Sequence, residues 1–169
     1  HKFKEEGDLV FLVGDIKREY SLGGSEFLKV VHGKVGGDVP AVDLEKEKRL
    51  HELLIKLIED DIIRSAHDVS VGGLAIALLE CLFGSGLGMD LNLYIEDRLD
   101  FFLFSENPSL VVLSVEKEKA ERLKDEVEAH GLDWLLLGRV REDGLFTLTN
   151  NEESIFENSV KEFEEIWQK

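Results

Sequence analysis

Residues 65–84 read SAHDVSVGGLAIALLECLFG. This segment begins as a strand-like run and ends as an apolar helix-like run, with Asp68, Ser70, Gly72 and Gly73 between the two. A strand that passes into a helix through glycines presents backbone N–H groups at the positive end of the helix. A carboxylate beside such a helix end suits a metal-bound phosphate, and it equally suits a plain capped helix. This turn is the strongest candidate site in the chain.

Hydrophobic periodicity and turn residues predict the other elements. Before the turn, the expected order is a strand at 8–13, a short helix at 26–32, a loop at 33–40, a helix from an Asp43 N-cap to about residue 60, and a strand at 62–67. After it, the order is a helix at 74–83, strands at 87–95 and 110–115, a helix at 116–130, and strands at 134–140 and 145–148 around an Asp-Gly hairpin turn. Phe156, Val160, Phe163 and Trp167 predict a last helical stripe.

Strands and helices alternate early and become hairpin-like late, which predicts a mixed α/β or α+β fold with a mixed β-sheet covered by helices. The 169 residues fit one domain that folds without disulfides, and Cys81 is expected to be a small core residue. No apolar run approaches the roughly 20 residues that span a bilayer. Because residue 1 is histidine and the only methionine is Met89, we expect residues 1–169 to be a single domain from a larger subunit.

The chain is strongly acidic, with 20 Lys and Arg against 36 Asp and Glu and a formal charge of −16. Such a charge repels nucleic acid and anionic membranes, so neither is an expected partner. Glu and Lys dominate the charged residues, a composition similar to that of proteins from hot environments.

The turn after residue 67 has two interpretations. In one, the Asp68 carboxylate is a hard oxygen ligand for Mg²⁺, the Ser70 hydroxyl donates to a phosphate, and the glycines let the phosphate approach the backbone. In the other, Ser70 caps the helix, Asp68 complements the helix dipole, and the glycines only make a tight turn. His67 is either a base or ligand or, more commonly for such a position, a hydrogen-bonded structural residue.

Two further segments carry polar side chains. Gly23-Gly24-Ser25 precedes a helix and could cradle an anion, but without a lysine or a longer glycine pattern helix initiation is the better explanation. Ser105-Glu106-Asn107 lies in a loop, where a polar turn initiated at Asn107-Pro108 is the simplest interpretation. No Ser-His-Asp order, Cys-His pair or His-Glu-x-x-His motif is present.

Three segments together resemble one known family over nearly the whole chain. They are LGGSEF at 22–27, SAHDVSVGGLA at 65–75, and Phe104-Ser105-Glu106 followed by a valine-rich strand. They are similar to the C-terminal domain of phosphoribosylformylglycinamidine synthase, in its small synthetase-subunit form. The resemblance implies an aminoimidazole ribonucleotide synthetase-like fold. It also implies a cytoplasmic, ATP-dependent ligase of purine biosynthesis, which converts formylglycinamide ribonucleotide to the amidine with glutamine-derived ammonia.

The resemblance also implies partners and site residues. The partners are the other domains of the same subunit, a glutaminase subunit and a small accessory subunit, and the cofactors are ATP and Mg²⁺. Asp68 matches an aspartate that coordinates Mg²⁺, and Ser70, with Gly72 and Gly73 beside it, matches a serine that contacts nucleotide at an auxiliary site. Ser105-Glu106-Asn107 departs from the family's substrate-binding pattern, so neither substrate binding nor any catalytic residue is assigned.

Two alternatives remain open. The domain could be purely structural, packing against a pseudosymmetric partner domain without binding a ligand. It could also belong to a relative in the same superfamily, such as aminoimidazole ribonucleotide synthetase, selenophosphate synthetase or a hydrogenase-maturation protein, although these commonly carry threonine at the position of Ser70.

Overall fold

The computed structural model describes residues 1–169 and contains one mixed β-sheet, as the sequence predicts. Its strands are β1 (Leu9–Gly14), β2 (Ser65–Asp68), β3 (Gly88–Leu93), β4 (Leu110–Val115), β5 (Asp133–Arg141), β6 (Leu145–Asn150) and β7 (Glu153–Ser159). The order across the sheet is β2-β4-β1-β5-β3-β6-β7. Only the β3–β6 pair is parallel, and every other neighbouring pair is antiparallel.

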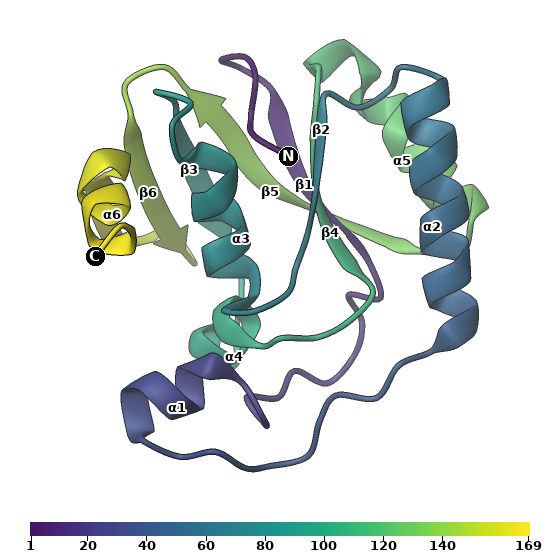
Figure 1. Ribbon diagram of the computed structural model, residues 1–169. Coiled ribbons are helices and arrows are strands. Elements are labelled where there is room, and N and C mark those ends of the chain that lie inside the picture. The colour runs from purple at the N-terminus through teal and green to yellow at the C-terminus, as the bar shows by residue number, and fades with distance from the viewer.

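Helices lie on both sides of this sheet (Figure 1). They are α1 (Glu26–His32), α2 (Leu44–Glu59), α3 (Gly73–Leu82), α4 (Leu99–Phe104), α5 (Ala120–Ala129) and α6 (Val160–Trp167), with a 3₁₀ turn at Lys117–Lys119. Helices α3, α4 and α6 pack on one face, while α2 and α5 pack on the other face over β4 and β1. Helix α1 lies at the bottom of Figure 1, within a long connection between β1 and α2.

The central strand β1 contributes to two separate cores. Phe11 points into the cluster formed with α2 and α5, whereas its neighbour Leu12 points into the larger cluster around α3. Both side chains are almost fully buried. Strands covered on both faces read as continuous apolar runs, which is why residues 9–13 carry no polar alternation.

Helix α2 forms where its cap and apolar stripe predict. The Asp43 carboxylate accepts hydrogen bonds from the Glu45 and Lys46 N–H groups at 3.0 and 3.1 Å. These backbone hydrogen bonds lower the pKa of Asp43, and Leu50 and Leu53 bury the helix face against the sheet.

Three elements differ from the sequence predictions: β2, α4 and β7. Residues 62–64 are not strand: the Ile62 N–H bonds the Leu57 carbonyl at 2.9 Å and closes the end of α2, so β2 starts at Ser65. Helix α4 was not expected. Phe156 lies on strand β7 rather than in the last helix, which begins only at Val160. The turn that creates β7 contains no glycine, so the hairpin has no glycine signal in the sequence.

The face of β3 and β6 opposite α3 has no covering helix and is organised around one carboxylate. Asp90 accepts hydrogen bonds from Arg139 at 3.2 Å, Arg141 at 2.5 Å and the Thr147 hydroxyl at 3.0 Å. Burial alone would raise the pKa of Asp90, but these three donors outweigh it and lower the pKa. The ionised form of Asp90 is therefore stabilised by folding.

The lowered pKa of Asp90 has a consequence for acid stability. The stabilisation is fully present above the unfolded-state value of about 3.9 and is lost as the pH falls through the lower folded-state pKa. We expect Asp90→Asn to reduce the free energy of unfolding by about 1–2 kcal/mol at pH 7, and the difference from wild type to shrink below about pH 4. Urea unfolding of wild type and Asp90→Asn between pH 7 and pH 3 measures this difference. Asp97→Asn is the control, because the Asp97 side chain is exposed and unpaired. If Asp90→Asn and wild type differed equally in free energy of unfolding at pH 7 and pH 3, the lowered pKa of Asp90 would be contradicted.

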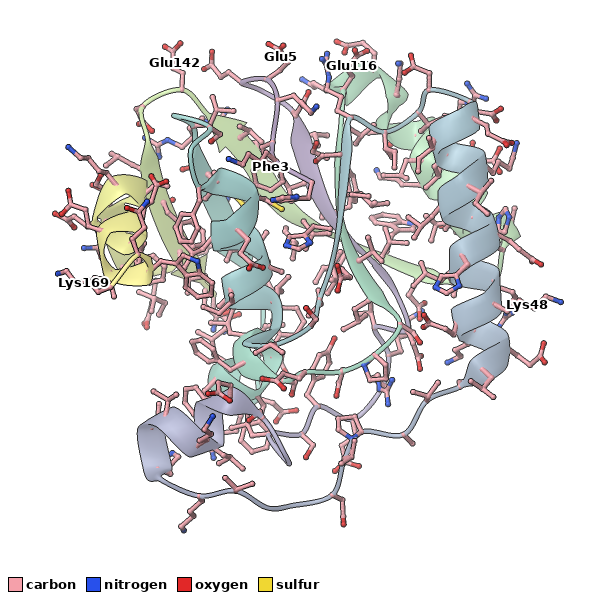
Figure 2. All side chains as sticks on the ribbon, viewed as in Figure 1. Phe3, Glu5, Lys48, Glu116, Glu142 and Lys169 are labelled. Atoms are coloured by element: carbon pink, nitrogen blue, oxygen red, sulfur yellow. The ribbon has the colours of Figure 1, made fainter.

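Charged side chains surround the molecule. Figure 2 shows Glu5, Glu116 and Glu142 at the top edge and Lys48 pointing outward from α2. Phe3, by contrast, is buried, and its N–H bonds the Cys81 carbonyl of α3 at 3.0 Å. None of the helices combines the length and the apolar character needed to cross a membrane.

Candidate functional site

The turn between β2 and α3 lies at the edge of the sheet. Asp68 is the last residue of β2 and pairs with Val111 of β4, and the Val69 N–H bonds the Leu110 carbonyl at 3.0 Å. Val69 is buried, whereas Ser70 and Val71 are exposed. In Figure 1 the chain runs from β2 to the lower end of α3 at this point. The sheet thus fixes one side of the turn and leaves its outer side open to solvent.

Asp68 and Ser70 carry the exposed polar side chains of the turn. The Asp68 side chain is 72% exposed, and the His67 Nδ1 atom lies 3.4 Å from its Oδ1 atom. The Ser70 hydroxyl makes no hydrogen bond within the chain. Ser70 therefore does not cap α3, whose N-cap is Gly72 without a side-chain hydrogen bond. The capping interpretation of Ser70 is wrong, and its hydroxyl is available to another group.

The two glycines are required by the packing of the turn. Gly72 and Gly73 have φ angles of 86° and 72°, in the left-handed region that favours glycine. A Cβ atom at Gly72 would lie 2.4 Å from Ile76 Cγ1, and one at Gly73 would lie 2.8 Å from the Leu103 carbonyl oxygen. Gly73 thus permits the close approach of α3 to α4, and Gly72 permits the tight turn into α3, as the tight-turn interpretation expects.

The N–H groups of these glycines are not free, contrary to the expectation from the sequence. The Gly73 N–H bonds the Ser70 carbonyl at 3.0 Å, which closes the turn. The Gly72 N–H donates to Oε1 of Glu106 at 2.9 Å, and the Glu26 N–H of α1 donates to the same oxygen at 2.9 Å. A carboxylate of the chain itself lies where two N–H groups converge, and sequence reasoning missed it because Glu106 is distant along the chain.

His67 occupies a structural position beside the turn. Its Nε2 atom lies 3.0 Å from Oε2 of Glu80 on α3, and its side chain is only 16% exposed. The ring therefore ties β2 to α3. This geometry supports the hydrogen-bonded structural interpretation of His67.

Gly23-Gly24-Ser25 initiates a helix, as expected. The Ser25 hydroxyl accepts from the Leu28 N–H at 3.3 Å and donates to the Leu22 carbonyl at 2.6 Å. Ser25 is buried and is the N-cap of α1. Its polar group is fully used within the chain.

An apolar groove of about 420 Å³ adjoins the turn between α1 and α3. It is lined by Glu26, Phe27, Val30, Val31, Val71, Gly72, Ile76, Phe104 and Trp167. Phe27 and Phe104 stack with their ring centroids 4.7 Å apart at its inner wall. Polar groups are scarce here, so the turn offers ligands on its Asp68 side and an apolar surface on its Val71 side.

The chain does not build a metal site by itself. No group of three or more His, Cys, Asp or Glu side chains is arranged to hold a metal ion. Cys81 is buried in the core, where desolvation raises the pKa of its thiol to about 12, as expected for a core residue. Asp68 supplies a single exposed carboxylate.

A comparison with protein families gives the class of this domain. Residues 5–150 match the family model described as AIR synthase related protein, C-terminal domain. Because the match covers most of the chain, the chain belongs to this family.

Two curated relatives of the chain are subunits of the same synthase. The chain is 46% identical over 166 residues to phosphoribosylformylglycinamidine synthase subunit PurL of Aquifex aeolicus, and 38% identical over 165 residues to the PurL subunit of Moorella thermoacetica. Each alignment covers 98% of this chain and 22% of the relative. The chain thus spans about a fifth of the length of the relatives it matches.

Solved structures share the fold at lower sequence identity. Phosphoribosylformylglycinamidine synthase II of Thermotoga maritima matches with a TM-score of 0.78 at 20% identity, over 96% of this chain and 27% of that chain. The T. maritima PurL structure complexed with FGAR matches with a TM-score of 0.83 at 18% identity, over 96% of this chain and 29% of that chain. The family match and this shared fold together confirm the aminoimidazole ribonucleotide synthetase-like architecture expected from the sequence.

Proposed function

We propose that the chain is the C-terminal domain of a phosphoribosylformylglycinamidine synthase subunit and that its β2–α3 turn forms half of an auxiliary nucleotide-Mg²⁺ cleft. The whole synthase would be a cytoplasmic, ATP-dependent ligase of purine biosynthesis that forms the amidine with glutamine-derived ammonia. The identity of 46% to a PurL subunit supports this assignment over other members of the superfamily.

The proposal for the cleft rests on the exposed side chains of Asp68 and Ser70. The exposed Asp68 carboxylate, whose one side-chain contact is the His67 ring at 3.4 Å, and the unpaired Ser70 hydroxyl lie on the open side of one turn. Mg²⁺ is commonly held by one or two carboxylates together with phosphate oxygens, so a single carboxylate from this domain is a sufficient contribution. Asp68 would hold the metal, Ser70 would donate to a phosphate oxygen, and Gly72 and Gly73 would give the turn its shape beside the nucleotide.

The other half of the cleft would come from another domain of the same subunit. Asp68 belongs to no group of three or more metal-binding side chains and forms no ion pair with a Lys or Arg; its one basic neighbour is the His67 ring, with Nδ1 at 3.4 Å. A glutaminase subunit and a small accessory subunit would complete the ammonia-using complex. A structure of PurLQS from Thermotoga maritima has the same fold over 95% of this chain, with a TM-score of 0.73.

Mutation of Asp68 tests the proposed cleft. In the full synthase polypeptide that carries this domain, we expect Asp68→Asn to weaken Mg-ADP binding at the auxiliary site roughly ten- to a hundredfold, because a metal ligand loses its charge. Isothermal titration with ADP at fixed Mg²⁺ measures this. Asp125→Asn on α5, an exposed acid on the opposite face of the sheet, is the matched control and should bind as wild type does. Unchanged affinity of Asp68→Asn for Mg-ADP would contradict the proposal that Asp68 holds the metal.

A purely structural domain is the second candidate, and the Glu106 contact favours it. Glu106 already satisfies the Gly72 N–H, so the end of α3 needs no external anion. In that case neither Asp68→Asn nor Ser70→Ala would alter nucleotide binding. The same titration therefore separates the two candidates.

A further inference from the structure

The connection between β1 and α2 is the least anchored part of the chain. Residues 29–43 are exposed except for half-buried Pro40, and Val35 and Val39 are 85% and 81% exposed. In Figure 1 this connection runs below α4 and returns to α2 along the bottom of the molecule. A segment with so little burial needs specific contacts to hold one position.

Three consecutive side chains of the α4–β4 loop hold the first part of this connection, residues 19–26. The Ser105 hydroxyl donates to the Ser21 carbonyl at 2.9 Å, and the Asn107 amide donates to the Glu19 carbonyl at 3.4 Å. Between them, Oε1 of Glu106 accepts from the Glu26 N–H at 2.9 Å. All three bonds join segments about 80 to 90 residues apart in sequence.

Glu106 is the central residue of these three because its carboxylate also accepts a hydrogen bond from the β2–α3 turn. The same Oε1 atom accepts from the Gly72 N–H at 2.9 Å, so one oxygen links the first turn of α1 to the N-cap of α3. Both helix ends carry partial positive charge, which a carboxylate stabilises. The Phe27–Phe104 stack reinforces the same junction from its apolar side.

We propose that Ser105, Glu106 and Asn107 form a clasp that fixes residues 19–27 against the N-terminal end of α3, with Glu106 as the positioning residue for the β2–α3 turn. The polar tripeptide thereby serves the chain itself and not a bound substrate. The clasp does not depend on the proposed nucleotide cleft, since every contact in it lies within the chain.

Hydrogen exchange of the 169-residue chain tests the clasp. We expect Glu106→Ala to speed exchange of the Glu26 and Gly72 amides about tenfold or more, because each loses a hydrogen bond to a charged acceptor. Glu106→Gln keeps an acceptor oxygen at the same reach and should restore most of the protection. Ser105→Ala should loosen residues 20–26 while leaving the Gly72 amide protected.

Amides of α2 around Leu53, in the other core, serve as the internal reference. Their exchange should stay at the wild-type rate in all three variants. Unchanged exchange at Glu26 and Gly72 in Glu106→Ala would overturn the clasp, and so would an equal rise in α2 in every variant. Neither result concerns nucleotide binding, so a failure of the clasp and a failure of the proposed cleft are distinguishable.

Discussion

Replacing Gly73 with alanine lowers the free energy of unfolding by about 2–5 kcal/mol. Two costs add at this position. The backbone has a φ of 72°, and the new Cβ would lie 2.8 Å from the carbonyl oxygen of Leu103 and from the backbone of Phe104. Backbone atoms cannot move aside as a flexible side chain does, so α3 and α4 must separate. Urea denaturation measures the loss.

Gly86 provides the matched control for Gly73. It has a similar φ of 76°, but a Cβ there would meet no atom within 4 Å. Gly86→Ala should therefore cost only the backbone strain, about 1 kcal/mol. Equal losses in the two variants would mean that the close approach of α3 to α4 does not constrain the turn.

Replacing Phe11 with alanine has an effect of similar size in the other core. Phe11 is fully buried against α2 and α5 and meets Trp134 edge to face, with ring centroids 6.0 Å apart. Removing its ring leaves a cavity in the core between the sheet and helices α2 and α5, so we expect a loss of about 3–5 kcal/mol in the free energy of unfolding.

Leu136 on β5 is the control for Phe11 because it is 42% exposed. Leu136→Ala should cost about 1 kcal/mol or less, since part of the side chain is already in water. Thermal and urea unfolding should rank the two variants in the same order. A loss in Phe11→Ala no larger than in Leu136→Ala would contradict the double-sided burial of β1.

The sequence predicted the elements whose signals are local. The cap at Asp43 and the leucine spacing of α2 lie within the helix itself, and β1 and β4 are continuous apolar runs. Strand β7 was missed because Phe156 fits a helical spacing with Val160 and Phe163, although in the structure it packs edge to face on Phe146 from a neighbouring strand. For a segment this short, tertiary packing decides whether it forms a strand or a helix.

The candidate site was predictable only in part. The position of Asp68 and Ser70 between a strand and a helix follows from the sequence pattern, and the structure leaves both side chains exposed to solvent. The engagement of the Gly72 N–H by Glu106 could not be predicted, because nothing in either segment signals that α4 brings them together. Long-range hydrogen bonds of this kind arise from the fold and have no local pattern.

Anomalous diffraction from crystals of the full synthase polypeptide grown with Mn²⁺ and ADP is the most direct test of the nucleotide-Mg²⁺ cleft. Mn²⁺ replaces Mg²⁺ at oxygen-rich sites and can be located by its anomalous signal. The proposed cleft predicts a peak at coordination distance, roughly 2.0–2.3 Å, from an Asp68 carboxylate oxygen, with an ADP phosphate near the Ser70 hydroxyl. Bound ADP and Mn²⁺ with no peak beside Asp68 would contradict it.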